Sequence, residues 1–264
     1  MVTADVVPPL PTPRHALFLD FDGTLVDIAA QPQDVALAAA TLHDLRTLEA
    51  ALEGALALVT GRALADIQPH LHDWQPALAG EHGAHWRSAA GCEATGAPPP
   101  DLAPIHAALQ ALSARHPELL VERKSAGIAL HYRQAPQLQQ LCRDTLTEAL
   151  RQTSGAELLA GKCVYEVRAA GNDKGRAIAR FLQQPPFAGR IPVFVGDDVT
   201  DEAGFAAVQA AGGLGVKVGP GESLAHARLD SPTAARAWLH QAAQHLAAAT
   251  PAAREELHPA PQHP

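Results

Sequence analysis

Residues 16–27 read ALFLDFDGTLVD, an apolar run that ends in two aspartates and a glycine. The run from Ala16 to Phe21 predicts a short strand that is buried on both faces, as strands of a parallel sheet are. Asp20 and Asp22 stand where this strand ends, and Gly23 permits a sharp turn of the backbone. Because ligands of α/β proteins bind at the carboxyl ends of the strands, we expect both carboxylates to lie in a binding site.

An alternation of helices and strands continues from this motif. Leucines at helical spacing predict a helix at 42–52, and the apolar run at 55–59 predicts a second strand. The alternation resumes late in the chain, with predicted helices at 174–182 and 201–210 and predicted strands at 191–195 and 213–218. Such winding is typical of a parallel α/β sheet.

The middle of the chain has a different pattern. Residues 119–133 and 157–168 each alternate as two short strands around a turn, which predicts antiparallel hairpins, and helices are predicted near 102–112 and at 136–151. We therefore predict a small α+β domain inserted into a parallel α/β core. The expected divisions are a poorly ordered, proline-rich tail at 1–14, a core at 15–86 and 169–250, an inserted domain at 87–168 and a second poorly ordered tail at 251–264.

Composition and charge exclude several classes of function. The formal net charge of the 264 residues is −8, whereas nucleic-acid-binding proteins concentrate Lys and Arg on one face. No apolar run reaches the roughly 18 residues of a membrane span, and the N-terminus lacks the pattern of a signal peptide. The three cysteines lie far apart and match no disulfide framework. We expect a cytoplasmic, monomeric protein that binds neither nucleic acid nor membranes.

Two further segments place phosphate-binding groups near the first strand. Thr60 follows the predicted strand at 55–59, so its hydroxyl and the Gly61 amide can donate hydrogen bonds to a phosphoryl oxygen. Lys174 opens a predicted helix, which brings an ammonium group and a helix N-terminus toward the same charge. Each residue alone has an ordinary structural explanation, such as a helix cap or a solvated charge. Their order and placement together favour phosphate chemistry.

Asp197, Asp198 and Asp201 form an acidic cluster after the predicted strand at 191–195. Nothing in the local sequence neutralises these carboxylates, so the cluster favours a bound cation. Oxygen ligands without a thiolate or histidine favour Mg²⁺ over zinc. Beside such an ion, one of the two strand-end aspartates could attack phosphorus while the other exchanges a proton with the leaving oxygen.

The ordered set DxDGT, threonine after a strand, lysine and GDDxxD resembles the haloacid dehalogenase (HAD) superfamily of phosphatases. The resemblance implies a Rossmann-like parallel-sheet core with an inserted α+β cap of the C2 type. It implies that Asp20 is the nucleophile, that Asp22 is the general acid and base, and that Thr60 and Lys174 hold the phosphate. The implied magnesium ligands are Asp20, Asp197 and the backbone carbonyl of Asp22, with Asp198 and Asp201 in support.

Wider phrases of the sequence, among them VTGR, GEHGA, ERKSAGIALHYR, YEVR and GDDVTDE, resemble the trehalose-6-phosphate phosphatases over about residues 15–220. The resemblance implies a phosphoric monoester hydrolase that converts trehalose 6-phosphate to trehalose and phosphate through an aspartyl-phosphate intermediate. The inserted domain would choose the leaving group, because the core recognises only the phosphate. The implied substrate-binding residues are Glu122, Lys124 and Glu166 on the distal glucose, with Arg62, Glu81 and His82 near the cleft.

Three alternatives stay open at the level of sequence. The first is a phosphatase of another sugar phosphate, such as sucrose 6-phosphate. The second is a phosphomutase, because an aspartyl phosphate can be passed to a sugar hydroxyl in place of water. The third is a sugar-phosphate sensor that keeps the fold without turnover, although a sensor has no use for an acid placed beside a nucleophile.

Overall fold

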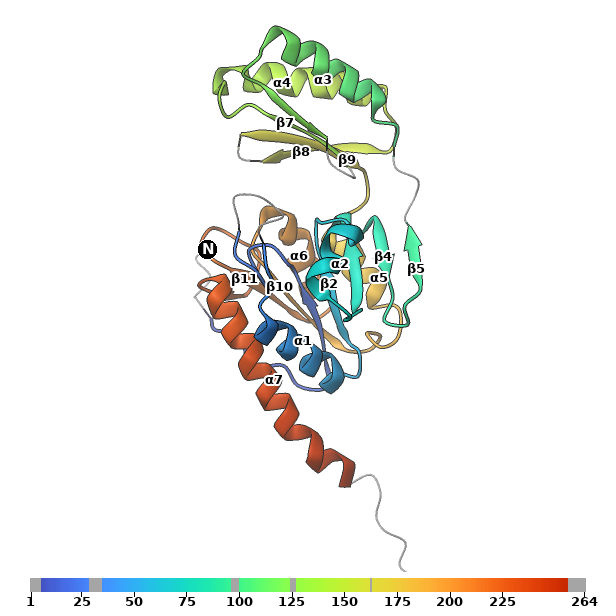
Figure 1. Ribbon diagram of the computed structural model, residues 1–264, viewed down its shortest axis with the longest axis vertical. Coiled ribbons are helices and arrows are strands. Elements are labelled where there is room, and N and C mark those ends of the chain that lie inside the picture. Colours follow the sequence, from blue (N-terminus) through green and yellow to red (C-terminus); the bar gives the residue numbers. More distant parts are fainter. Residues whose placement is uncertain (1–5, 29–34, 96–99, 124–126, 162, 256–264) are drawn as a thin grey trace, which may run out of the picture. The chain divides into compact units, whose positions relative to one another are not determined.

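The computed structural model describes residues 6–28, 35–95, 100–123, 127–161 and 163–255 (Figure 1). Contacts within the chain divide it into two compact units. We call Met1–Ala94 with Asp173–Pro264 the core unit, and Thr95–Asn172 the inserted unit. Among the described helices, none combines the length and the apolar character that crossing a bilayer requires.

The core unit is built on one eight-stranded sheet in the order β12-β11-β10-β1-β2-β3-β4-β5. The strands from β12 to β3 are mutually parallel, and β4 runs antiparallel to β3. Their bounds are β1 His15–Leu19, β2 Leu56–Val59, β3 Ala77–Gly80, β4 His85–Arg87, β5 Glu93–Thr95, β10 Ile191–Gly196, β11 Leu214–Val218 and β12 Ala227–Leu229.

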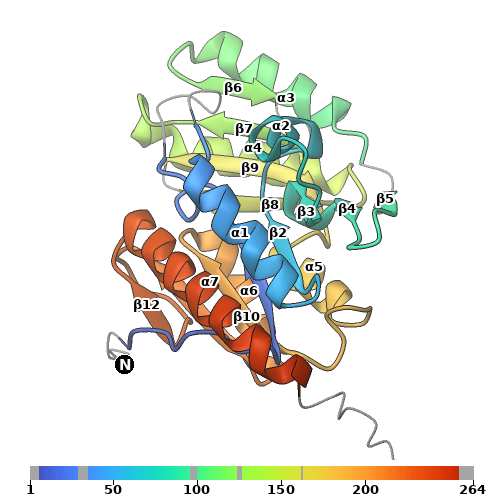
Figure 2. The same ribbon diagram turned by 60° about the horizontal axis from the view of Figure 1, so that its bottom comes forward.

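Helices cover both faces of this sheet. Helix α1 (Ala39–Ala51) lies along α7 (Pro232–Glu255) on one face, and α5 (Lys174–Phe181) lies along α6 (Glu202–Ala210) on the other (Figure 2). Helix α2 (Leu64–Leu71) contacts β3. Because both faces are covered, β1 is apolar at every position from Ala16 to Leu19, and these residues are fully buried.

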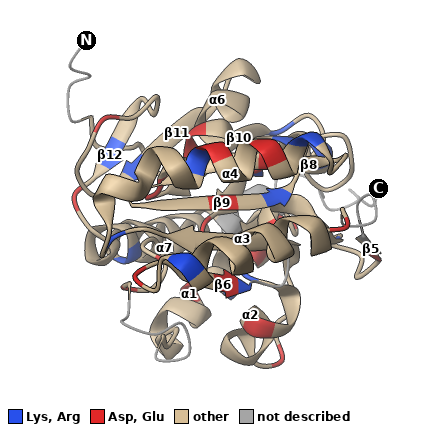
Figure 3. Ribbon diagram, turned by 90° about the horizontal axis from the view of Figure 1, so that it is seen from above, with Lys and Arg blue, Asp and Glu red and all other residues tan. Residues whose placement is uncertain are grey.

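The inserted unit has its own core. Its antiparallel sheet has the order β6-β7-β9-β8, with β6 Leu120–Arg123, β7 Gly127–His131, β8 Ala156–Gly161 and β9 Val164–Ala169. Helices α3 (Ala103–Arg115) and α4 (Gln139–Arg151) contact each other, and their apolar residues share one buried cluster with apolar residues of the sheet. Figure 3 shows both acidic and basic residues on α4, whereas α3 is almost entirely uncharged, with Arg115 at its end.

The fold class that the sequence predicts is confirmed: a mostly parallel α/β core carries a separate antiparallel α+β insertion. The helix predicted at 136–151 begins with a 3₁₀ turn, Pro136–Leu138, before α4. The helix predicted at 201–210 is preceded by a 3₁₀ turn at Val199–Asp201. Strand β5 extends the core sheet, although it lies beyond the expected division at residue 87.

The N-terminal segment differs from the expectation of a poorly ordered tail. Residues 6–14 lie against the core unit, where the Arg228 amide donates to the Val6 carbonyl at 3.0 Å. The Trp238 indole donates to the Pro8 carbonyl at 3.1 Å. These bonds hold the segment although its prolines suggested a tail. At the other end, residues 251–255 complete α7, and residues 256–264 lie outside the described part of the chain.

Candidate active site

Four adjacent parallel strands bring the predicted catalytic segments to one edge of the core sheet. Strands β10, β1, β2 and β3 lie side by side, and each is followed directly by a polar residue of interest. These residues are Asp197, Asp20, Thr60 and Glu81. The carboxyl ends of parallel strands meet at the same edge, so residues that are distant in sequence form one site.

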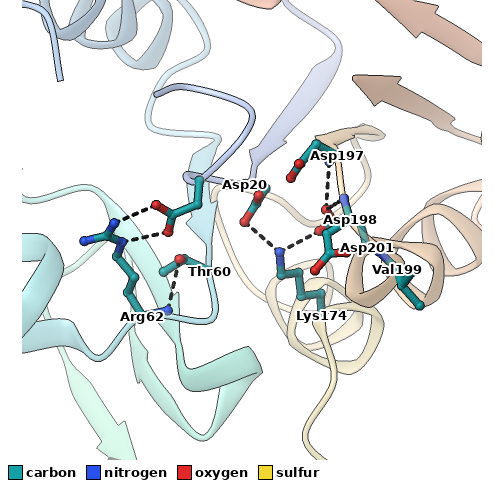
Figure 4. Close-up of polar contacts among 9 residues, drawn as sticks. Asp20, Thr60, Arg62, Lys174, Asp197, Asp198, Val199 and Asp201 are labelled. Carbon is teal, nitrogen blue, oxygen red and sulfur yellow. Dashed lines mark hydrogen bonds and ion pairs between the residues drawn. The ribbon is translucent and has the colours of Figure 1, made fainter. Parts of the chain in front are cut away.

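Lys174 joins the nucleophile candidate to the acidic cluster. Its ammonium nitrogen lies 2.6 Å from Asp20 Oδ1 and 2.6 Å from Asp201 Oδ1 (Figure 4). All three side chains are buried, which strengthens the attraction between their charges. Burial alone would lower the pKa of Lys174, but the two carboxylates outweigh it and raise the pKa. Burial raises the pKa of Asp20 well above its usual value, and Lys174 opposes this shift.

Lys174 and Asp201 are both positioned by the N-terminal turn of a helix. Asp173 caps the N-terminus of α5, since its carboxylate accepts from the Arg176 amide at 2.7 Å. Asp198 and Asp201 form a reciprocal capping box at the 3₁₀ turn that precedes α6. This local chemistry fixes the direction of each side chain at the edge of the sheet.

Both carboxylate oxygens of Asp201 accept hydrogen bonds, and two of these bonds support the acidic loop. Its Oδ2 accepts the main-chain amides of Asp197 at 2.9 Å and of Asp198 at 2.8 Å, while its Oδ1 accepts from Lys174. Asp198 Oδ1 accepts a hydrogen bond from the Val199 main-chain amide at 2.6 Å. Asp198 and Asp201 therefore hold the loop in shape.

Asp197 offers a carboxylate that accepts no hydrogen bond from the described residues. One oxygen atom each of Asp197, Asp20 and Asp201 lies within 4.8 Å of the others. The Asp197 carboxylate also packs against the turn after β1, because a Cβ built on Gly23 would lie 2.1 Å from Asp197 Oδ2. Burial, together with repulsion from Asp201 and Asp198, raises the pKa of Asp197 to about 6. This set of hard oxygen donors, two of them buried and Asp197 half-buried, fits a divalent metal ion.

Asp22 pairs with Arg62 rather than with the acidic cluster. Arg62 Nε donates to Asp22 Oδ2 at 2.7 Å, and Arg62 Nη2 donates to Asp22 Oδ1 at 2.6 Å. The guanidinium lies over the Phe21 ring, 5.4 Å from its centroid. Arg62 also contacts Thr60, the residue expected to hold the phosphate: the Arg62 main-chain amide donates to Thr60 Oγ1 at 3.1 Å (Figure 4). The sequence predicted Arg62 near the site but not this pairing.

A strained turn after β3 supports the loop from Thr60 to Arg62. Glu81 and His82 are consecutive left-handed residues, with φ of 49° and 57°. The Glu81 amide donates to the Arg62 carbonyl at 2.9 Å, and the His82 amide donates to the Thr60 carbonyl at 3.0 Å. Gly61 packs against the His82 ring, since a Cβ at Gly61 would lie 2.8 Å from His82 Nε2. Such strain persists where surrounding structure holds it, often at functional sites.

Lys217 is a residue of this site that the sequence analysis did not single out. It lies within β11 and is buried, and its ammonium nitrogen donates to the main-chain carbonyls of Asp197 at 2.6 Å and Val218 at 2.5 Å. Burial lowers the pKa of Lys217, whereas the charge of Asp197 opposes this shift. The signal in the sequence was a charged residue inside the apolar run GVKV, because a strand buried on both faces has no ordinary use for lysine.

The inserted unit carries Glu122 and Glu166, two of the residues implied in sugar binding, on one row of its sheet. Glu122 is registered opposite Ala129, which in turn is opposite Glu166, so all three share the same face. Glu122 Oε2 lies 2.8 Å from His131 Nε2 on the neighbouring strand. Lys124 lies outside the described residues. The apolar residues of the opposite face belong to the cluster with α3 and α4.

Comparisons with known proteins show which family this chain resembles. Residues 18–233 match the family model of trehalose-phosphatase. The trehalose-6-phosphate phosphatase of Escherichia coli is 40% identical over 228 residues, which cover 86% of this chain and 85% of that protein. The C-terminal domain of the Candida albicans trehalose-6-phosphate phosphatase has a TM-score of 0.71 at 22% identity, covering 88% of this chain and 93% of that one.

A more distant solved structure supports the fold assignment. A protein of Bacteroides thetaiotaomicron, studied among phosphatases of the HAD superfamily, has a TM-score of 0.61 at 14% identity. The match covers 92% of this chain and 96% of that one, so both the core and the insertion are shared. The predicted HAD-like fold is thereby confirmed. Because the family model spans most of the sequence and the E. coli relative matches along most of its length, the chain belongs to the trehalose-phosphatase family.

Proposed function

We propose that this protein hydrolyses trehalose 6-phosphate to trehalose and inorganic phosphate, with Asp20 as the nucleophile. The observation that carries the proposal is the contact of the buried Asp20 carboxylate with Lys174, beside the carboxylate of Asp197, which accepts no hydrogen bond from the residues that the structure describes. A carboxylate at the end of a strand, next to a fixed cation, is placed to meet a phosphoryl group. The E. coli relative, whose name gives the same activity, supports this substrate.

The chemistry divides between two aspartates in two steps. In the first, Asp20 attacks phosphorus, the bond from phosphorus to the sugar oxygen breaks, and Asp22 gives a proton to that oxygen. In the second, Asp22 takes a proton from water, the water oxygen attacks phosphorus, and the aspartyl-phosphate bond breaks to restore Asp20. Each step is a displacement that needs positioning and charge stabilisation more than covalent help from other residues.

Fixed charges around Asp20 would stabilise the transferring group. Lys174 is held by Asp201 with its ammonium toward Asp20, and Thr60 presents a hydroxyl at the end of β2. We propose that Mg²⁺ is the cofactor, held by Asp20, Asp197 and the backbone carbonyl of Asp22. When bound, the ion would neutralise phosphoryl charge and orient the phosphate against Asp20.

The inserted unit would select the sugar. We propose that the face bearing Glu122 and Glu166 binds hydroxyl groups of trehalose, with Lys124 as a third partner. Carboxylates accept hydrogen bonds from two adjacent hydroxyls, and an ammonium donates to them, so this face has the right chemistry for an uncharged sugar. The core needs no sugar contact for its own step, which explains why specificity resides in the inserted unit.

Phosphate release from a panel of sugar phosphates tests the proposal. Trehalose 6-phosphate should be hydrolysed best, with phosphate and trehalose released in equal amounts, and thorough chelation with EDTA should abolish turnover until Mg²⁺ is restored. Asp20→Asn should lose activity by at least roughly 10³-fold, because the nucleophile is removed. Normal turnover by Asp20→Asn would overturn the mechanism. A better rate on sucrose 6-phosphate, or a sugar phosphate product without free phosphate, would overturn the substrate or the reaction class.

A further inference from the structure

The Arg62 side chain occupies both oxygens of Asp22 in the structure. The two bonds, 2.7 and 2.6 Å long, form the parallel fork that a guanidinium makes with a carboxylate. The Arg62 side chain is 12% exposed, so its pair with Asp22 is partly shielded from water. The hydrogen bond with Asp22 is the main cause of a raised pKa of Arg62.

This arrangement is incompatible with the role proposed for Asp22. A general acid must carry a proton on one carboxyl oxygen, and a general base must have an oxygen open to water. Arginine is a donor only and stays charged, so it cannot exchange that proton itself. The fork must therefore open before Asp22 can act.

A hydrogen bond of its main chain also places Arg62 beside the candidate phosphate-holding residues, because the Arg62 amide is bonded to Thr60 Oγ1. The charge of Asp20 also contributes to the raised pKa of Arg62, as expected for a guanidinium that feels the field of the nucleophile. A phosphoryl dianion offers paired acceptor oxygens that suit the same fork.

We propose that Arg62 exchanges Asp22 for the phosphoryl group of the substrate, so that phosphate binding releases the carboxylate that serves as acid and base. The inference rests on the proposed function of Asp22. In the free enzyme the fork keeps both carboxylate oxygens of Asp22 bonded to Arg62. In the complex Arg62 neutralises phosphate charge, and Asp22 becomes available only when a substrate is present.

Orthophosphate binding in a double-mutant cycle tests the exchange without turnover. The dissociation constant of orthophosphate with saturating Mg²⁺ is measured by calorimetry for the wild type, Asp22→Asn, Arg62→Gln and the double variant. If Asp22 and phosphate compete for Arg62, Asp22→Asn should tighten orthophosphate binding roughly fivefold more when Arg62 is present than when it is Gln. The charge removed is the same in both backgrounds, so a general electrostatic effect cancels.

Asp66→Asn is the matched control. Asp66 lies in the first turn of α2, is exposed and adds to the raised pKa of Arg62 only through its charge. It should show no coupling to Arg62 in the same cycle. Equal effects of Asp22→Asn in the two Arg62 backgrounds, with thermal melting showing that all variants are folded, would overturn the exchange. That result would leave the proposed function untouched, because hydrolysis of trehalose 6-phosphate is measured independently by phosphate release.

Discussion

Asp197 makes the affinity of the site for a cation depend on pH. Burial and the neighbouring carboxylates raise the pKa of the Asp197 carboxyl to about 6, and burial raises the pKa of Asp20 as well. A proton and Mg²⁺ compete for these oxygens. We expect the dissociation constant of Mg²⁺ to be constant above about pH 7 and to rise toward tenfold per unit as the pH falls well below 6.

Titration calorimetry at pH 7.5, 6.0 and 5.0 checks this expectation. Near pH 6, Mg²⁺ binding should release protons, so the measured heat should differ between buffers of different ionisation enthalpy. Asp197→Asn should weaken binding at pH 7.5 and flatten the pH dependence, because the titrating ligand is gone. A Mg²⁺ affinity that is the same at pH 5.0 and 7.5 would contradict the assignment of Asp197 as a ligand.

At the scale of elements, the turn after β3 stores backbone strain beside the phosphate loop. A non-glycine residue in the left-handed region costs roughly 1 to 2 kcal/mol, and His82 is one of two such residues in succession. His82→Ala and His82→Gly both remove the ring that packs against Gly61, but only glycine relieves the strain. We expect His82→Gly to have a free energy of unfolding about 1 kcal/mol higher than His82→Ala in urea titrations.

His43 provides the control for this comparison. It is exposed in the interior of α1, where glycine is the poorer residue. His43→Gly should be about 1 kcal/mol less stable than His43→Ala, the reverse of the order at His82. The same order at both positions would show that the turn after β3 carries no strain that glycine can relieve.

Local sequence patterns predicted the helices and strands that carry the chemistry. They could not predict which side chains pair across long sequence separations. The apolar run before Asp20 predicted β1 because parallel strands are buried on both faces, and strand ends predicted where Asp20, Thr60 and Asp197 meet. The fork between Asp22 and Arg62 joins residues 40 positions apart, and no local signal encodes it. Short strands such as β4 and β12 were missed because three residues give too little periodicity.

Lys217 is a second residue whose partners the sequence could not predict. It lies within the strand predicted at 213–218, but its partners are carbonyl oxygens, and any residue has a carbonyl. Sequence can therefore mark a buried lysine as unusual without saying which loop it holds. The structure identifies that loop as the one that bears Asp197.

At the scale of the whole molecule, the proposed function assigns phosphate chemistry to the core unit and sugar recognition to the inserted unit. Each unit has its own buried apolar cluster, so changes on the face of the inserted sheet that bears Glu122 and Glu166 should leave the core unit intact. A substrate without a sugar, p-nitrophenyl phosphate, needs only the core chemistry. The two substrates therefore report on the two units separately.

Glu122→Ala and Glu166→Ala should each raise KM for trehalose 6-phosphate and lower kcat/KM roughly 10- to 100-fold, because a hydrogen bond to a charged group contributes about 1.5 to 3 kcal/mol. Hydrolysis of p-nitrophenyl phosphate should be unchanged in both variants. Glu148→Ala is the control, since Glu148 is an exposed residue of α4 that pairs with Arg151 on the same helix. It should leave both substrates unaffected. Equal losses on the two substrates would show that Glu122 and Glu166 support the fold of the inserted unit, and sugar selection would then have to reside elsewhere in the chain.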